Sequence, residues 1–121
     1  MAGERILLLE DDDLVGPLIE HVLLSNGYHV HLVSRVAEAQ DLLRSRSYDL
    51  VIADALVPDG SGITVADEAR TLGIKTLVIS GNATGLPQNQ LQGHEYALKP
   101  IRPTELLRLV QLAIDGKREA P

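Results

Sequence analysis

Polar side chains that could do chemistry stand at the ends of four short apolar segments of the sequence. In chain order they are Glu10 with Asp11, then Asp54, Ser80 and Lys99. The carboxyl ends of parallel strands share one edge of a sheet, where ligands bind in open α/β folds, so strands here would bring these five together. Each residue also has an ordinary interpretation, as a helix cap, a turn residue or a surface lysine. One shared site explains the pattern better than four separate coincidences.

The acidic residues of this set predict a divalent metal site. Carboxylates that share one edge repel each other and raise one another's pKa unless a cation joins them. Oxygen ligands with open positions suit Mg²⁺, or Mn²⁺ in its place, and Mg²⁺ commonly bridges carboxylates and phosphate oxygens. We expect the metal to bind Asp11, Asp54 and the backbone carbonyl of Ala55 or Leu56.

The same residues predict phosphoryl transfer. A carboxylate can attack phosphorus to give an aspartyl phosphate, and Asp54, opposite the acidic pair, is the natural nucleophile. The metal would neutralise charge on the transferring group. Lys99, a mobile point charge, would pair with one phosphoryl oxygen. Ser80 would donate a hydrogen bond to another oxygen only when phosphate is present.

Strands alternate with helices around these residues. Short apolar runs predict buried strands, and one alternating run predicts a half-exposed strand, at residues 6–9, 28–33, 49–53, 76–79 and 95–98. Helical spacing predicts one helix from about Asp13, one capped by Ser34, one from about Ile63 and one from Pro103. Between residues 81 and 93 the apolar stripe is nearly absent, which predicts a short or irregular fourth helix. We expect one α/β domain over residues 1–121, with a core of about 4–115, a parallel sheet and a frayed tail at 116–121.

Composition narrows the class of protein. A net charge of −6 argues against a nucleic-acid surface, because phosphate binding needs clustered Lys and Arg. The absence of cysteine excludes disulfides and fits a reducing cytoplasm, where we expect the protein to act. No apolar run approaches the length of a membrane-spanning helix, and the N-terminus lacks the pattern of a signal peptide.

Four stretches, in this order and spacing, together match a known family. They are ILLLEDD at 6–12, DLVIAD at 49–54 with PDGSG at 58–62, LVIS at 77–80 and YALKP at 96–100. The chain resembles the receiver domain of bacterial two-component response regulators over nearly its whole length. The resemblance implies a flavodoxin-like, doubly wound sheet of five parallel strands in the order 2-1-3-4-5.

The resemblance also implies a function. Asp54 would accept a phosphoryl group, in a Mg²⁺-dependent reaction, from a phosphohistidine of a histidine kinase or a histidine phosphotransfer protein. Glu10 and Asp11 would be the metal-site acids, with Asp11 ligating directly. Ser80 and Tyr96 would form a switch pair that changes partner binding. Such a domain is a phosphoacceptor rather than an enzyme, although it assists its own phosphorylation and dephosphorylation.

Two further expectations concern exposed leucines. On the last helix, Leu112 falls within the polar face and Leu107 on its flank, so we expect these two to contact a partner or a second copy of the chain. Leu56 lies two residues after Asp54, where a polar side chain could position an attacking water. We therefore expect a long-lived phosphorylated state, unless Asn82 supplies the polar group.

Other functions fit the sequence less well. A degenerate receiver would bind partners without phosphotransfer, although all five site residues are present. A small hydrolase with an aspartate nucleophile would need an acid where Leu56 stands. A dinucleotide-binding domain would need a glycine-rich loop after the first strand, where the chain is acidic. His29 and His31 share a strand face, but two ligands without a third indicate a solvated surface rather than a metal site. A stand-alone regulator and a receiver from a longer chain both remain open.

Overall fold

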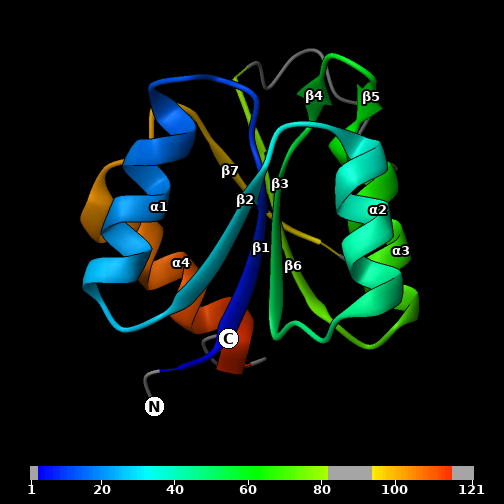
Figure 1. Cartoon of the computed structure of the whole chain (residues 1–121). Helices are drawn as coiled ribbons and strands as arrows, with labels where there is room; N and C mark the ends of the chain where they lie inside the picture. The colour runs from blue at the N-terminus through cyan, green and yellow to red at the C-terminus, as the bar shows by residue number, and fades with distance from the viewer. Residues whose placement is uncertain (1–2, 82–93, 116–121) are drawn as a thin grey trace.

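The computed structural model describes residues 3–81 and 94–115. Its centre is a five-stranded parallel sheet with the order β2-β1-β3-β6-β7 (Figure 1). The strands are β1 (Arg5–Leu9), β2 (His29–Val33), β3 (Leu50–Asp54), β6 (Lys75–Ser80) and β7 (Glu95–Leu98). Since β6 and β7 are the fourth and fifth strands of this sheet, the predicted order 2-1-3-4-5 is confirmed.

Helices cover both faces of the sheet. One face carries α1 (Val15–Ser25) and α4 (Pro103–Asp115), and the other carries α2 (Val36–Ser45) and α3 (Gly62–Thr71) (Figure 1). Pro17 lies in the first turn of α1, where its missing N–H costs nothing, as predicted. Pro103 opens α4, also as predicted. None of the helices in the described part of the chain has the length and apolar character needed to cross a membrane.

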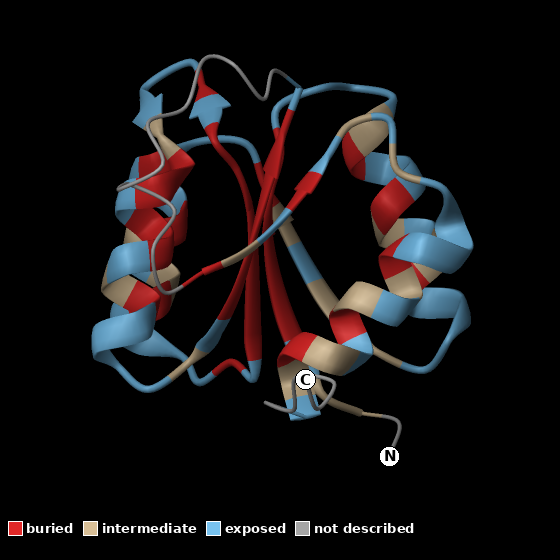
Figure 2. Ribbon diagram, turned by 180° about the vertical axis from the view of Figure 1, so that it is seen from behind, coloured by how far each residue is buried: buried red, intermediate tan, exposed pale blue. Residues whose placement is uncertain are grey.

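The central strands are buried on both faces, which explains their continuous apolar sequence (Figure 2). Alternate residues enter two separate apolar clusters. Leu8 and Ile52 belong to the cluster under α1 and α4, whereas Leu7 and Val51 belong to the cluster under α2 and α3. The edge strand β2 exposes His29 and His31, in agreement with the predicted half-exposed strand.

A short antiparallel hairpin follows β3, where the sequence predicted only a loop. Its strands are β4 (Leu56–Val57) and β5 (Gly60–Ser61). Ser61 ends the hairpin and caps α3, because its Oγ accepts the Ile63 N–H at 3.1 Å. The predicted loop after Asp54 is therefore an ordered connection between the sheet and α3.

The predicted cap of α2 by Ser34 is wrong. The residue at the cap position is Arg35, which makes no side-chain capping bond. Instead, the Asp59 carboxylate of the hairpin accepts the Val36 N–H at 2.7 Å and the Ala37 N–H at 3.1 Å. A charged acceptor makes stronger bonds to these N–H groups than a hydroxyl can, so a residue distant in sequence takes the place of Ser34.

Four expectations stay predictions. Those for the irregular fourth helix, the frayed tail and Asn82 concern residues outside the described part of the chain, and the single-domain boundaries are not tested. Leu107 and Leu112 are half-buried rather than exposed, and Leu107 packs against the core cluster under α4. The contact of these two leucines with a partner stays a prediction.

Candidate functional site

The carboxyl edge of the sheet brings together the predicted acidic residues and Lys99. Glu10 follows β1, Asp54 ends β3, and Lys99 follows β7. Lys99 Nζ donates a hydrogen bond to Asp54 Oδ2 at 2.9 Å and forms an ion pair with Glu10 Oε1 at 2.7 Å. Three segments far apart in the sequence thus meet at a single ammonium group.

Asp11 completes a cluster of three carboxylates. Glu10, Asp11 and Asp54 each offer one oxygen within 4.8 Å of the others. Glu10 and Asp54 are buried, whereas Asp11 is exposed. Three carboxylates facing one ammonium leave an excess of negative charge, which a divalent cation would neutralise. The all-oxygen donor set and the open side at Asp11 fit Mg²⁺, which keeps several waters.

Burial and charge act together on the ion pair. Burial raises the pKa of the Glu10 carboxyl, and the bond from Lys99 opposes this without cancelling it. For Lys99, burial lowers the pKa, but the bonds to Glu10 and Asp54 outweigh burial, so its pKa lies above the ordinary value. Lys99 therefore stays charged at neutral pH and compensates the two buried acids.

The backbone after Asp54 holds its carboxylate in place. Asp54 Oδ1 accepts the Leu56 N–H at 3.1 Å, and the Ala55 N–H donates to the Ile79 carbonyl at 2.8 Å. The Ala55 carbonyl already accepts the Gly62 N–H at 3.0 Å. Of the two backbone carbonyls considered as metal ligands, that of Leu56 is therefore the better candidate.

Gly62 allows the chain to close behind Asp54. A Cβ on Gly62 would lie 1.8 Å from the Asp54 carbonyl oxygen and 2.8 Å from the Asp54 carbonyl carbon. Both of these atoms belong to the backbone, so neither can turn aside. The sequence Pro-Asp-Gly-Ser-Gly suggested only a turn, whereas the structure shows that Gly62 is required for close packing against the phosphoacceptor candidate.

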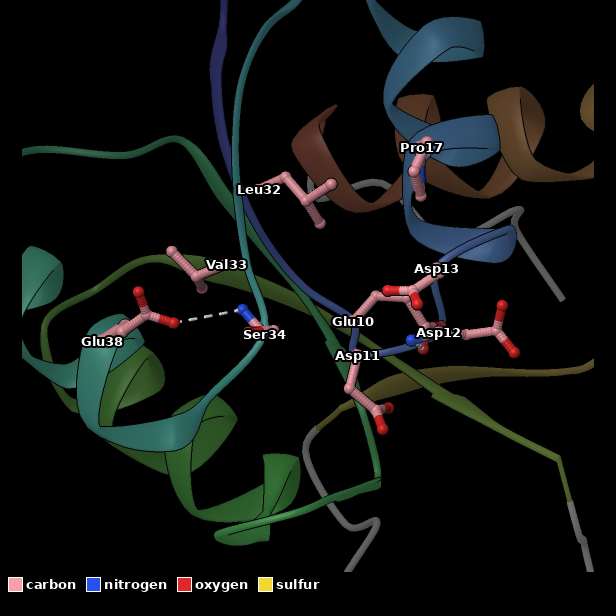
Figure 3. Close-up of a pocket in the computed structure, with 9 residues that line it drawn as sticks. All are labelled: Glu10, Asp11, Asp12, Asp13, Pro17, Leu32, Val33, Ser34 and Glu38. Atoms are coloured by element: carbon pink, nitrogen blue, oxygen red, sulfur yellow. Dashed lines mark hydrogen bonds between the residues drawn. The ribbon is translucent and has the colours of Figure 1, made fainter.

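Two more acidic residues, Asp12 and Asp13, follow Asp11 in the loop after β1. Asp12 and Asp13, with Glu10 and Asp11, line one side of an open pocket, and Glu38 lies across from them (Figure 3). Asp12 Oδ1 accepts the N–H groups of Leu14 at 2.8 Å and Val15 at 2.9 Å, so Asp12 caps the start of α1. Asp12 therefore stabilises the start of α1 and does not belong to the three-carboxylate cluster.

Ser80 and Tyr96, which the family resemblance predicts to form a switch pair, lie on the adjacent strands β6 and β7. Ser80 is the last residue of β6 and is buried, and its carbonyl accepts the Lys99 N–H at 2.8 Å. The Tyr96 side chain is 47% exposed on β7. The aromatic ring therefore lies outward in this structure.

A polar network around the buried His94 was not predicted from the sequence. His94 Nδ1 lies 2.6 Å from Thr76 Oγ1, and His94 Nε2 lies 2.7 Å from Asp67 Oδ1. The network joins α3, β6 and the start of β7 at the end of β6 opposite the carboxylate cluster. Nothing in the spacing of the three residues in the sequence could have paired them.

Among known protein families, the response regulator receiver domain matches residues 6–111 of this chain. Response regulator RppA of Synechocystis sp. is 36% identical over 110 residues, covering 85% of this chain and 47% of that protein. Cell cycle transcriptional regulator CtrA of Caulobacter vibrioides is 30% identical over 115 residues, covering 91% of this chain and 50% of that protein. The chain spans about half the length of these relatives.

Solved structures share the same fold. The receiver domain of sensor histidine kinase PA1611 from Pseudomonas aeruginosa, with a magnesium ion coordinated in its active site cleft, is 30% identical with a TM-score of 0.84, covering 94% of this chain and 99% of that one. The structure of response regulator TrrA from Thermotoga maritima, in complex with Mg(2+)-BeF, is 28% identical to this chain and has a TM-score of 0.82. The match covers 89% of this chain and 96% of that one. A CheY-like receiver domain protein from Methanospirillum hungatei has a TM-score of 0.85 at 24% identity, and the match covers 95% of this chain and 96% of that one.

Proposed function

The chain belongs to the response regulator receiver domain family, and from this premise we propose that it accepts a phosphoryl group on Asp54. The donor would be the phosphohistidine of a histidine kinase or of a histidine phosphotransfer protein. The observation that carries the proposal is the contact of Lys99 Nζ with both Asp54 and Glu10 beside Asp11. This arrangement supports the proposed roles of Asp54 as the nucleophile, of the acidic residues as metal ligands and of Lys99 as the cation that pairs with phosphate.

Each residue of the site has a separate role in the proposed phosphoryl transfer. An Asp54 carboxylate oxygen attacks phosphorus, the P–N bond to the donor imidazole breaks, and the imidazole leaves as the neutral ring after taking up a proton. Lys99 moves from the Asp54 carboxylate to a phosphoryl oxygen, and the Ser80 hydroxyl donates to another. Asp11, Asp54 and the Leu56 carbonyl, with Glu10 nearby, would hold Mg²⁺ or Mn²⁺, and the bound cation would supply positive charge to balance the negative charge on the transferring group.

The phosphoryl group would then act as a switch. Reorientation of Ser80 toward the phosphate leaves space into which Tyr96, exposed in this structure, can turn. Inward movement of the ring would change the surface of β7 and α4 that partners meet, and Leu107 and Leu112 of α4 remain part of that proposed surface. The same proposal includes self-association through this surface and action in the cytoplasm. It also includes the expectation that this domain makes no contact with nucleic acid.

The test is incubation with a small acyl phosphate or phosphoramidate, with and without Mg²⁺, followed by intact-mass measurement. We expect Mg²⁺-dependent gain of one phosphoryl group by the wild type and none by Asp54→Asn. Asp41→Asn, which changes an exposed aspartate on α2, should behave as the wild type. A folded wild-type protein that takes up no phosphate from any donor would instead favour the degenerate receiver that only binds partners.

A further inference from the structure

The carboxylate of Asp59 attaches the hairpin after Asp54 to the start of helix α2. We infer that Asp59 is a positioning residue of the metal site, because it fixes the hairpin that presents the Leu56 carbonyl. The inference rests on the proposed function, since it concerns the same Mg²⁺ site. It adds a physical connection from that site to α2, a helix that contributes no residue to the carboxylate cluster.

The attachment is bidentate and joins distant parts of the chain. Asp59 Oδ1 accepts the Val36 N–H at 2.7 Å, and Asp59 Oδ2 accepts the Ala37 N–H at 3.1 Å. The helix has no side-chain cap of its own, so Asp59 satisfies two N–H groups that would otherwise need water. The bond from Val36, followed by that from Ala37, lowers the pKa of Asp59, so the carboxylate stays ionised at neutral pH.

Apolar contacts support the same attachment. Val57 of β4 is buried in the cluster that contains Val36 of α2. A Cβ built on Gly60 would lie 3.6 Å from Val36 Cγ2, so the turn of the hairpin runs close to the start of the helix. The hairpin therefore rests on α2 through one polar and one apolar contact.

The other end of the hairpin reaches the phosphoacceptor candidate. Leu56 pairs with Ser61 across the hairpin, and the Leu56 N–H donates to Asp54 Oδ1. The Leu56 side chain is 72% exposed and anchors nothing in the core. The position of the Leu56 carbonyl is consequently set by its backbone bonds and by the attachment of the hairpin through Asp59.

Two consequences follow from this connection. Loss of the Asp59 carboxylate releases the tip of the hairpin and lowers Mg²⁺ affinity, because the Leu56 carbonyl must then be ordered during binding. Coupling between sites is reciprocal, so bound Mg²⁺ must in turn strengthen the bonds from Val36 and Ala37 to Asp59. The amides of these two residues should exchange with solvent more slowly in the presence of Mg²⁺.

The experiment measures Mg²⁺ affinity by calorimetry and amide exchange by NMR, both without any phosphodonor. We expect Asp59→Ala to weaken Mg²⁺ binding about fivefold, at the lower end of couplings between sites. Asp59→Asn keeps one acceptor oxygen and should weaken binding less. Asp41→Ala removes an exposed carboxylate from the middle of α2 and should leave Mg²⁺ affinity unchanged.

The outcomes separate this inference from the proposed function. Wild-type protein that does not bind Mg²⁺ would refute the metal site itself. Wild-type protein that binds Mg²⁺ without added protection at Val36 and Ala37 would refute the inference alone, and this arm needs no variant to fold. Faster exchange in Asp59→Ala with unchanged Mg²⁺ affinity would show that Asp59 only caps α2.

Discussion

Replacing Lys99 by methionine would leave two buried carboxylates without their counter-charge. Lys99 Nζ lies 2.7 Å from Glu10 Oε1 and 2.9 Å from Asp54 Oδ2, and the Glu10 side chain is only 1% exposed. At an effective dielectric constant of about 20, a charge pair at such separations is worth roughly 6 kcal/mol before desolvation is subtracted. The pair is thus strong enough for its loss to appear in the free energy of unfolding.

The net cost is smaller than this Coulombic value. Removing one member of a buried ion pair typically lowers the free energy of unfolding by about 3 to 5 kcal/mol. The Lys99 side chain is 23% exposed, so water compensates part of the loss. We expect Lys99→Met to lower the free energy of unfolding by about 3 kcal/mol at neutral pH without Mg²⁺.

The cost should depend on pH, because Glu10 can take up a proton. Burial already raises the pKa of Glu10, and removing Lys99 raises it further. A carboxyl whose pKa is higher in the folded protein than in the unfolded chain destabilises the fold above the unfolded value. The loss in Lys99→Met should therefore be complete above the raised pKa of Glu10 and shrink as the pH falls toward the ordinary value of 4.5.

Urea unfolding followed by circular dichroism, in chelator and at several pH values, measures this loss. Lys75→Met is the matched control, because Lys75 is exposed at the opposite end of β6 and its replacement makes the same change in net charge. Mg²⁺ should recover more stability in Lys99→Met than in the wild type, since the carboxylate cluster is then uncompensated. A loss equal to that of Lys75→Met, or one that does not change with pH, would refute the reasoning.

Three further predictions concern the same edge of the sheet. In thermal unfolding, Mg²⁺ at a hundredfold excess over Kd should raise the free energy of unfolding by ~2.7 kcal/mol. Asp11→Asn should remove most of this gain, and an undiminished gain would exclude Asp11 as a ligand. Gly62→Ala should destabilise the fold strongly in the same assay, because its Cβ would lie 1.8 Å from the Asp54 carbonyl oxygen. Gly81→Ala should not, since no atom of the described residues lies within 4 Å of its Cβ, and equal effects would contradict the packing argument. Leu56→Asn should shorten the lifetime of the phosphorylated protein, followed by intact mass after donor removal, and an unchanged lifetime would show that this position does not orient water.

The parts of the fold that could be predicted are those that local sequence determines. Continuous apolar runs indicated buried strands, and a polar residue directly after each run marked the edge of the sheet where Asp54 and Lys99 meet. Strand alternation with helices then left few arrangements of the sheet. The acidic pair of Glu10 and Asp11 could accordingly be expected beside Asp54, where the three carboxylates lie within 4.8 Å of one another.

The features that could not be predicted depend on contacts between distant residues. Asp59 stands in a Pro-Asp-Gly sequence that equally fits a simple turn, and only the fold brings it to the start of α2, 23 residues from Val36 in the sequence. Ser34 has the right residue type for a cap, but its competitor is charged and comes from another element. His94 likewise looks like a surface histidine until Thr76 and Asp67 are placed beside it.

The central claim is that Asp54 carries the phosphoryl group at a metal-dependent site, and locating the modified residue tests it most directly. Borohydride reduces an acyl phosphate to an alcohol, which marks the modified aspartate permanently as homoserine. After incubation with a small phosphodonor and Mg²⁺, peptide mass mapping should find homoserine at position 54, and chelation of Mg²⁺ should abolish it. Reduction at Glu10, Asp11 or any other carboxylate instead, or the same yield without Mg²⁺, would contradict the account.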